Sequence, residues 1–355
     1  MKPTLPLFAA ALALALASPA YAQVAAPAEV PAATKTWVGG QVFSDFSVPT
    51  SAFFPQAFEI KRARIYANAA FNPTWSAAVV YNVRAMSYDL SGKSVQDAEA
   101  GYLEMGYVQA TNLYPGSRVQ MGAIITPWFE YEAKAWGYRM LGLLPDAGGL
   151  SPDRRGVNLV PFYDFGASLK GDCSLAGIPL GYSLAVLNGE DVRHTETDGQ
   201  KDYEGRLSVT ALPGLELTGM VHRHNQATGP ATREAGLAVY EQAGYKLALE
   251  TVFSQDTPLV GASATGQILG GWVVVPIPGM PIPTEAVVRA DYITGDTKTM
   301  DVAKGYRFET VAGLNFTPVK GVRLFLNNQN LDFHNADGSA LVNEDIVALN
   351  TELTF

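Results

Sequence analysis

Charged residues and cysteine are both scarce in this sequence, and each scarcity excludes a class of protein. Only 17% of the 355 residues are charged, against roughly 25% in an ordinary globular domain, while 48% are hydrophobic. The single cysteine, Cys173, excludes a disulfide framework and a metal site built from cysteines. Acidic residues (34) outnumber basic ones (25), so the net charge of −9 excludes nucleic-acid binding through a generally basic surface.

A long apolar helix is also missing after the N-terminal segment. The most apolar later stretch, Gly270–Pro283, contains four prolines that break any helix. Residues 1–22 combine Lys2, an apolar run and small residues ending at Ala22, which predicts a cleaved secretory signal peptide rather than an N-terminal membrane anchor. Residues 23–35, rich in alanine and proline, are expected to form a disordered lead-in. An exported chain of this kind is either soluble or a β-barrel.

The sequence does contain a recurring two-residue alternation. In 343–355, Val347, Leu349 and Leu353 alternate with Asn350 and Glu352. This period fits a strand with one apolar and one wet face. The same pattern recurs in Phe58–Phe71, Thr74–Met86 and Ser117–Thr126. In each of these segments, the polar side of the alternation contains arginine. An arginine that faces lipid at the middle of a bilayer costs roughly 2–4 kcal/mol, so the polar side must face a water-filled lumen.

The connections between such segments alternate between short and long. Seven short Pro/Gly turns and eight longer loops separate sixteen predicted strands. The fold class predicted for residues 36–355 is therefore all-β, a transmembrane antiparallel β-barrel of about sixteen strands. A secreted soluble β-sandwich or propeller is the alternative. A propeller would repeat a motif in each blade, and the sequence has no such repeat. A soluble β-protein would fill its core with the apolar side chains, which leaves no room for the charged side chains on the opposite face of the strands.

Four arginines in the polar phases are the candidate pore-lining residues: Arg62, Arg64, Arg84 and Arg118. Arginine stays charged, and its guanidinium can donate two parallel hydrogen bonds to one oxyanion. A column of arginines along the pore wall therefore favours the passage of anions. The alternative is a weakly selective wall in which these arginines pair with acidic residues such as Glu104, because charge rings can set either preference.

The longest predicted connection, Pro127–Asp153, is expected to fold into the barrel as the third long loop. Trp128 and Tyr131 make it too apolar to extend into water, and Lys134 and Arg139 would then line a constriction. A loop packed over a neighbouring subunit is the other interpretation of this apolar surface.

Histidine gives a metal-like spacing at one place. His222 and His224 share one face of a strand, but two ligands without a third are too few, so no metal site is predicted. No catalytic residues or cofactors are predicted either, because no nucleophile motif such as G-x-S-x-G is present.

Several segments together carry a family resemblance. Phe58–Arg64 resembles the paired-arginine strand of the phosphate-selective porins, the porin O and P family. The pieces that follow in the same order are Gln120–Gly122 with Thr126-Pro127, Asp153–Val157, Gly181–Gly189 and Lys201–Arg206. The resemblance implies a sixteen-stranded outer-membrane barrel, usually trimeric, whose third outer loop folds inward. It also implies that Arg62, Arg64, Arg84 and Arg118 are wall residues and that Lys134 and Arg139 are loop residues. The chain departs from the family in lacking a dense lysine cluster in its loops.

The predicted function is that of a bacterial outer-membrane porin. Its partners would be the lipid bilayer, small hydrophilic solutes, chiefly anions such as phosphate, and two further copies of the chain. The alternatives are a structural or adhesin-like barrel with a plugged lumen and a cation-preferring general porin.

Overall fold

The computed structural model describes residues 35–49, 57–84, 100–141, 161–192, 194–225, 229–261, 263–295, 305–334 and 339–355. The predicted signal peptide (1–22) and nearly all of the predicted lead-in (23–35) lie outside the described residues, as do residues 142–160 of the long loop region. In the part that is described, no helix is both long and apolar enough to cross a membrane.

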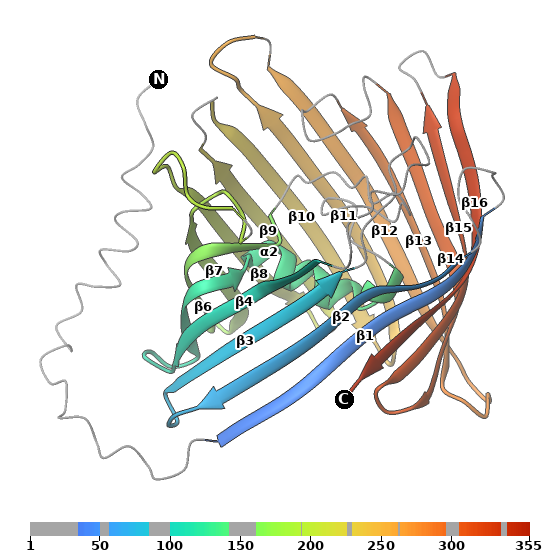
Figure 1. The fold of residues 1–355 in the computed structure, drawn as a ribbon, viewed down its shortest axis with the longest axis horizontal. Coiled ribbons are helices and arrows are strands. Elements are labelled where there is room, and N and C mark those ends of the chain that lie inside the picture. Colours follow the sequence, from blue (N-terminus) through green and yellow to red (C-terminus); the bar gives the residue numbers. More distant parts are fainter. Residues whose placement is uncertain are drawn as a thin grey trace, which may run out of the picture.

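Sixteen antiparallel strands form one closed barrel, as the alternation of turns predicts (Figure 1). The strands are β1 (Lys35–Pro49), β2 (Ala57–Ala70), β3 (Trp75–Arg84), β4 (Ala100–Thr111), β5 (Ser117–Ile125), β6 (Tyr163–Leu175), β7 (Ile178–Leu187), β8 (Asp202–Leu212), β9 (Leu215–His224), β10 (Ala231–Gln242), β11 (Tyr245–Asp256), β12 (Ala264–Ile277), β13 (Thr284–Gly295), β14 (Tyr306–Val319), β15 (Val322–His334) and β16 (Ala340–Thr354). Each strand pairs with its sequence neighbours, and β1 pairs with β16 to complete the ring.

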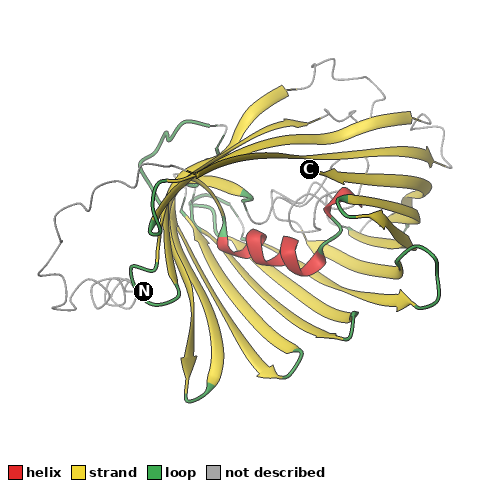
Figure 2. Cartoon of the chain, turned by 90° about the horizontal axis from the view of Figure 1, so that it is seen from below, coloured by secondary structure: helices red, strands yellow, loops and turns green. Residues whose placement is uncertain are grey.

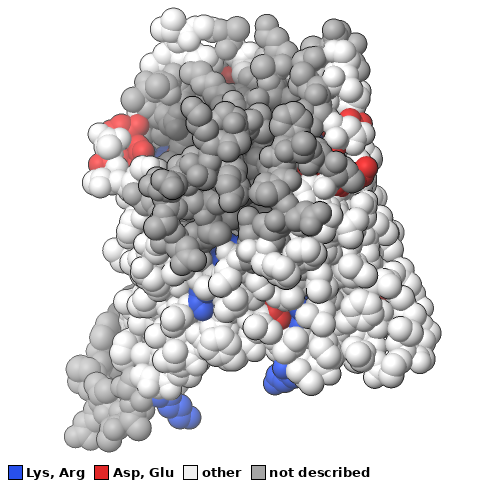
Figure 3. Space-filling model, turned by 45° about the vertical axis from the view of Figure 1, so that its right-hand side comes forward, with Lys and Arg blue, Asp and Glu red and all other residues white. Residues whose placement is uncertain are grey.

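The two-residue alternation separates an apolar outside from a mixed inside. In β11, Leu247, Leu249 and Phe253 are exposed on the outer face, whereas Glu250 and Val252 are buried inside. The face of the molecule seen in Figure 3 is accordingly largely free of charged atoms, with most acidic atoms in small groups in its upper half and most basic atoms in its lower half. An apolar belt of this kind is typical of a barrel that sits in a bilayer.

The C-terminal residue completes the closure. The backbone of Phe355 exchanges two hydrogen bonds with Gly40, of 2.9 and 3.0 Å. Its ring lies against Gly40, where an added Cβ would come within 2.4 Å of a ring atom. A side chain at this position of β1 would displace the terminal ring from its present place against the first strand.

Two β-bulges add an extra residue to the inner face of the barrel. The extra residue is Lys61 in the pairing of β2 with β1, and Glu104 in the pairing of β4 with β3. A bulge interrupts the alternation, so that two consecutive side chains can face the same side. Lys61 Nζ reaches the carboxylate of Asp45 at 2.7 Å, and Glu104 is fully buried.

The connection after β5, predicted to be a loop, begins with a helix. Helix α2 spans Pro127–Trp136, and the short 3₁₀ helix η2 spans Arg139–Leu141. Proline occupies the first turn of α2, where its missing N–H costs nothing, and Gly137 ends it in the left-handed region with φ of 78°. Glu130 near the start and Lys134 near the end complement the helix dipole.

Helix α2 lies inside the ring of strands, so the predicted inward fold of the third long connection is confirmed (Figure 2). A buried apolar cluster joins α2 and η2 to the inner faces of β9–β15, and it also includes Phe43 on β1 and Tyr163 on β6. The core of this molecule is thus located within the barrel, between the inserted segment and the surrounding wall.

Candidate functional site

Aromatic side chains fasten the inserted segment to the barrel wall. Trp136 is fully buried, and its ring centroid lies 5.5 Å from that of Trp272 on β12 in an edge-to-face arrangement. Tyr138 packs at 5.8 Å from Phe325 on β15, and Trp128 is fully buried at the start of α2. Such pairs contribute energy beyond burial alone, so the segment has a defined position in the lumen.

Hydrogen bonds from several strands hold the backbone of the same segment. The Trp128 N–H donates to Glu204 on β8 at 2.6 Å. Lys246 on β11 donates to the Ala135 carbonyl at 3.0 Å. Arg323 donates to the Gly137 carbonyl at 2.6 Å and Asn350 to the Met140 carbonyl at 3.4 Å. A side-chain contact adds to these, since the Tyr138 hydroxyl donates to Glu285 at 2.8 Å. The segment therefore spans the lumen from β8 to β16.

A buried ion network supports the aromatic contact. The Arg289 guanidinium lies 4.9 Å from the Trp136 ring centre and 4.7 Å from that of Trp272. It also binds Asp291 at 2.8 Å and Glu250 at 2.9 Å, and its side chain is completely buried. Cation–π contacts strengthen when they are desolvated, so Arg289 ties the wall strands to the helix.

Across the lumen, Arg62 and Arg64 share the carboxylate of Glu104. We call this group of residues the Glu104 station. Arg62 lies 3.2 Å from Glu104 Oε2, and Arg64 binds both carboxylate oxygens. Asn82 also donates to Glu104, and Arg64 donates to the Tyr163 hydroxyl. Glu104 continues the inward alternation of Tyr102 on β4, whose hydroxyl accepts from Asn82, with Leu103 exposed on the outer face between them.

A third arginine joins this station from the inserted segment. The Arg139 guanidinium stacks over the Phe129 ring at 4.8 Å from its centre. It lies close enough to Glu104, Arg62 and Arg64 to interact with them electrostatically. Three arginines thus face one carboxylate, which gives the Glu104 station an excess of positive charge.

The other two predicted wall arginines lie apart from this group. Arg118 is exposed on β5 and is the cross-strand partner of Lys170 on β6, so the two are neighbours on one face. Lys170 Nζ lies 2.7 Å from Glu130 on α2. Arg84 is the last residue of β3 and pairs with Arg62 in the strand register, but its side chain lies outside the described part.

The remaining predicted loop residues have different environments. The Tyr131 ring is half-buried and lies 4.7 Å beneath the guanidinium of Arg206 on β8. Lys134 is exposed on α2. Of the predicted constriction residues, Trp128, Tyr131 and Arg139 therefore make tertiary contacts.

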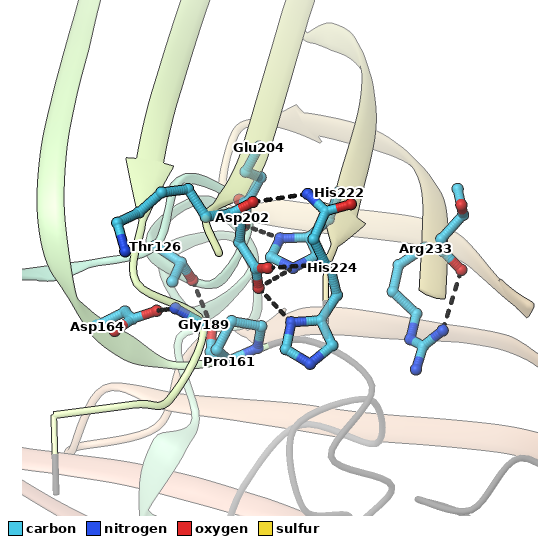
Figure 4. A network of polar contacts seen from close by, with 12 residues as sticks. Thr126, Pro161, Asp164, Gly189, Asp202, Glu204, His222, His224 and Arg233 are labelled. Atoms are coloured by element: carbon cyan, nitrogen blue, oxygen red, sulfur yellow. Dashed lines mark hydrogen bonds and ion pairs between the residues drawn. The ribbon is translucent and has the colours of Figure 1, made fainter. Parts of the chain in front are cut away.

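A second polar cluster lies at the start of β8 and the end of β9 (Figure 4). The His222 ring lies between two carboxylates, with Nε2 at 3.2 Å from Asp202 and Nδ1 at 3.0 Å from Glu204. His224 Nδ1 contacts the same Asp202 oxygen, and Asp202 also accepts the Asn225 N–H at 2.8 Å. Sequence spacing identified the two histidines but could not supply Asp202, because that contact depends on strand register.

No protein-family model matches the chain, and no curated protein matches it. Solved structures do match over most of the chain. An anion-selective porin from Comamonas acidovorans aligns with a TM-score of 0.62 and 11% identity, covering 91% of this chain and 100% of that one. The outer membrane channel DcaP of Acinetobacter baumannii aligns with a TM-score of 0.58 and 11% identity, covering 93% and 100%. The trimer form of OmpT, an outer membrane protein of Vibrio cholerae, aligns with a TM-score of 0.56 and 10% identity, covering 91% and 100%. At these identities the likeness establishes the porin-like barrel fold.

Proposed function

We propose that the protein is an outer-membrane porin through which small hydrophilic solutes diffuse passively, with a preference for small anions. The observation that carries the anion preference is the Glu104 station, where two arginines of the wall strand β2 and one of the inserted segment face one carboxylate. A charged group lining a narrow pore attracts ions of the opposite sign and repels those of its own sign. Arg118 and Lys170 would form a second basic stretch. Among the described residues, the ion pair of this stretch is the one between Lys170 and Glu130.

The setting of these residues supports passage rather than catalysis. The apolar outer belt and the closed ring are typical of a chain that lies in a bilayer, and the inserted segment narrows the lumen without needing a moving part. The resemblance to phosphate-selective porins makes phosphate the first anion to test. We further propose an outer-membrane location and a homotrimeric assembly, because one of the similar structures is the trimer form of Vibrio cholerae OmpT.

Reversal potentials test the anion preference directly. The purified barrel is inserted into a planar bilayer under a tenfold KCl gradient, and the sign of the zero-current potential gives the preferred ion. We expect chloride to be preferred, and a double Arg62→Gln/Arg64→Gln variant to reduce the preference. A cation-selective wild-type channel contradicts the anion assignment. Phosphate titrated against chloride then ranks the two anions.

A plugged structural or adhesin-like barrel is the second candidate. The observation in its favour is the apolar cluster that packs α2 and η2 against β9–β15 inside the barrel. If that packing continues across the lumen, the reconstituted protein gives no ion conductance. Measurable single-channel steps in the same bilayers decide for the porin.

A further inference from the structure

We infer that Asp202, His222 and His224 form a binding site for a divalent transition-metal ion such as Zn²⁺. The spacing of the two histidines places them on one face of β9, and a third ligand was the missing element. The fold supplies it, because β8 pairs with β9 so that Glu204 lies opposite His222. Asp202, two residues earlier on β8, is thereby brought beside His224.

The donor atoms of these three residues lie within metal-binding range of one another. One nitrogen of each histidine and one carboxylate oxygen of Asp202 all lie within 4.8 Å of each other. His222 Nε2 is 3.2 Å from the Asp202 oxygen. Ligand atoms at about 2.0–2.2 Å from a tetrahedral zinc ion are separated by about 3.3–3.6 Å. The His224 contact must open slightly to reach that spacing, which its partly exposed ring permits.

The set of donors selects the class of ion. Two imidazoles and one carboxylate suit zinc, copper, nickel or iron, whereas calcium and magnesium prefer oxygen ligands alone. Three protein ligands leave a fourth position for water or a solute. His224 is the least buried of the three ligands, so an ion would reach the site from the side of this residue.

Glu204 supplies the outer partner that metal-binding histidines usually have. It lies 3.0 Å from His222 Nδ1, which directs Nε2 towards Asp202. A carboxylate in this position fixes the orientation and the tautomer of a ligating imidazole. Its other oxygen accepts the Trp128 N–H, so the cluster is anchored to the start of α2.

Charge balance favours a dication at this position. Asp202 and Glu204 are both completely buried, and with neutral imidazoles the four side chains carry two negative charges. Arg233 on β10 is the cross-strand partner of His222, and its guanidinium forms an ion pair with Asp256 at 2.6 Å. A divalent ion neutralises the two buried carboxylates, which are costly to keep charged without a partner.

The alternative is a purely structural cluster in which a protonated His222 bridges the two carboxylates. Calorimetric titration of the folded, detergent-purified barrel with Zn²⁺ separates the two. We expect one ion per chain, and a parallel Co²⁺ titration should give the intense visible absorption of tetrahedral Co²⁺, as three protein ligands and one water would produce. Absence of stoichiometric binding of both ions overturns the metal assignment, whether or not the barrel conducts.

Matched variants locate the site. His224→Gln should weaken zinc binding at least tenfold, and the isosteric Asp202→Asn variant should do the same. His334→Gln is the control, because His334 also contacts a carboxylate, that of Asp332 at 2.8 Å, but is not part of the cluster. Heat-modifiable gel mobility verifies that each variant is folded. Unchanged binding in His224→Gln and Asp202→Asn, or an equal loss in His334→Gln, contradicts the assignment.

Discussion

Removing the carboxylate of the Glu104 station should make the channel more anion-selective by a predictable amount. Glu104→Gln keeps the size and some hydrogen bonds of the side chain but removes its charge from between Arg62 and Arg64. A unit charge about 5 Å from a permeating ion contributes ~0.8 kcal/mol in water. Screening at 0.1 M salt reduces this to ~0.5 kcal/mol. The anion gains this energy and the cation loses it, so the permeability ratio should rise about fivefold.

Salt dependence distinguishes this electrostatic effect from a change in pore shape. At 1 M salt the Debye length falls to about 3 Å, so the same variant should change the ratio by less than about twofold. The assay is the reversal potential in planar bilayers at both mean salt concentrations. Glu250→Gln is the matched control, since Glu250 also pairs with a buried arginine, Arg289, but lies beside α2 and away from the station. An unchanged ratio in Glu104→Gln, or an equal shift in Glu250→Gln, refutes the reasoning.

Three further substitutions and one deletion test the inserted segment and the closure of the barrel. Trp136→Ala removes a fully buried ring, so we expect the free energy of unfolding to fall by ~3–5 kcal/mol and the single-channel conductance to rise. An unchanged conductance would show that α2 does not narrow the pore. Deleting Phe355 removes its contacts with Gly40 and should lower the yield of heat-modifiable barrel, and Gly40→Val should reproduce the loss because its side chain would collide with the same ring. Lys134→Gln changes an exposed side chain and should alter stability by less than about 0.5 kcal/mol in thermal denaturation, so a larger change would reveal a contact of Lys134.

The fold was predictable because strand alternation is a local property. Each strand of a barrel needs an apolar outer face, so residues such as Leu349 and Leu353 reveal the outer phase without any knowledge of their neighbours. The bulges at Lys61 and Glu104 could not be recognised in this way, because an extra residue is defined only against the partner strand. Helix α2 did carry local signals, with proline at its first turn and Gly137 at its end.

The candidate site was predictable only in part, because pairing within the lumen depends on contacts between distant segments. Arg62 and Arg64 could be assigned to the wall from alternation, but their shared partner could not. Arg139 was assigned to the constriction from the apolar character of its loop, and its position over Phe129 follows from tertiary packing. The link between Asp202 and His224 likewise follows from strand register, which the sequence does not specify by itself.

The net charge of the chain is a poor guide to the preference of its pore. The formal charge is −9, yet exposed charges farther than about one Debye length, roughly 8 Å at physiological salt, are largely screened from an ion in the lumen. A permeating ion therefore responds to the groups that it passes closely. At the Glu104 station, Arg62 and Arg64 outnumber the carboxylate, and Arg118 lies beside Lys170 on the neighbouring wall. An acidic protein can thus favour anions, provided that its acidic residues are kept at the rims or are matched inside the barrel by arginine and lysine.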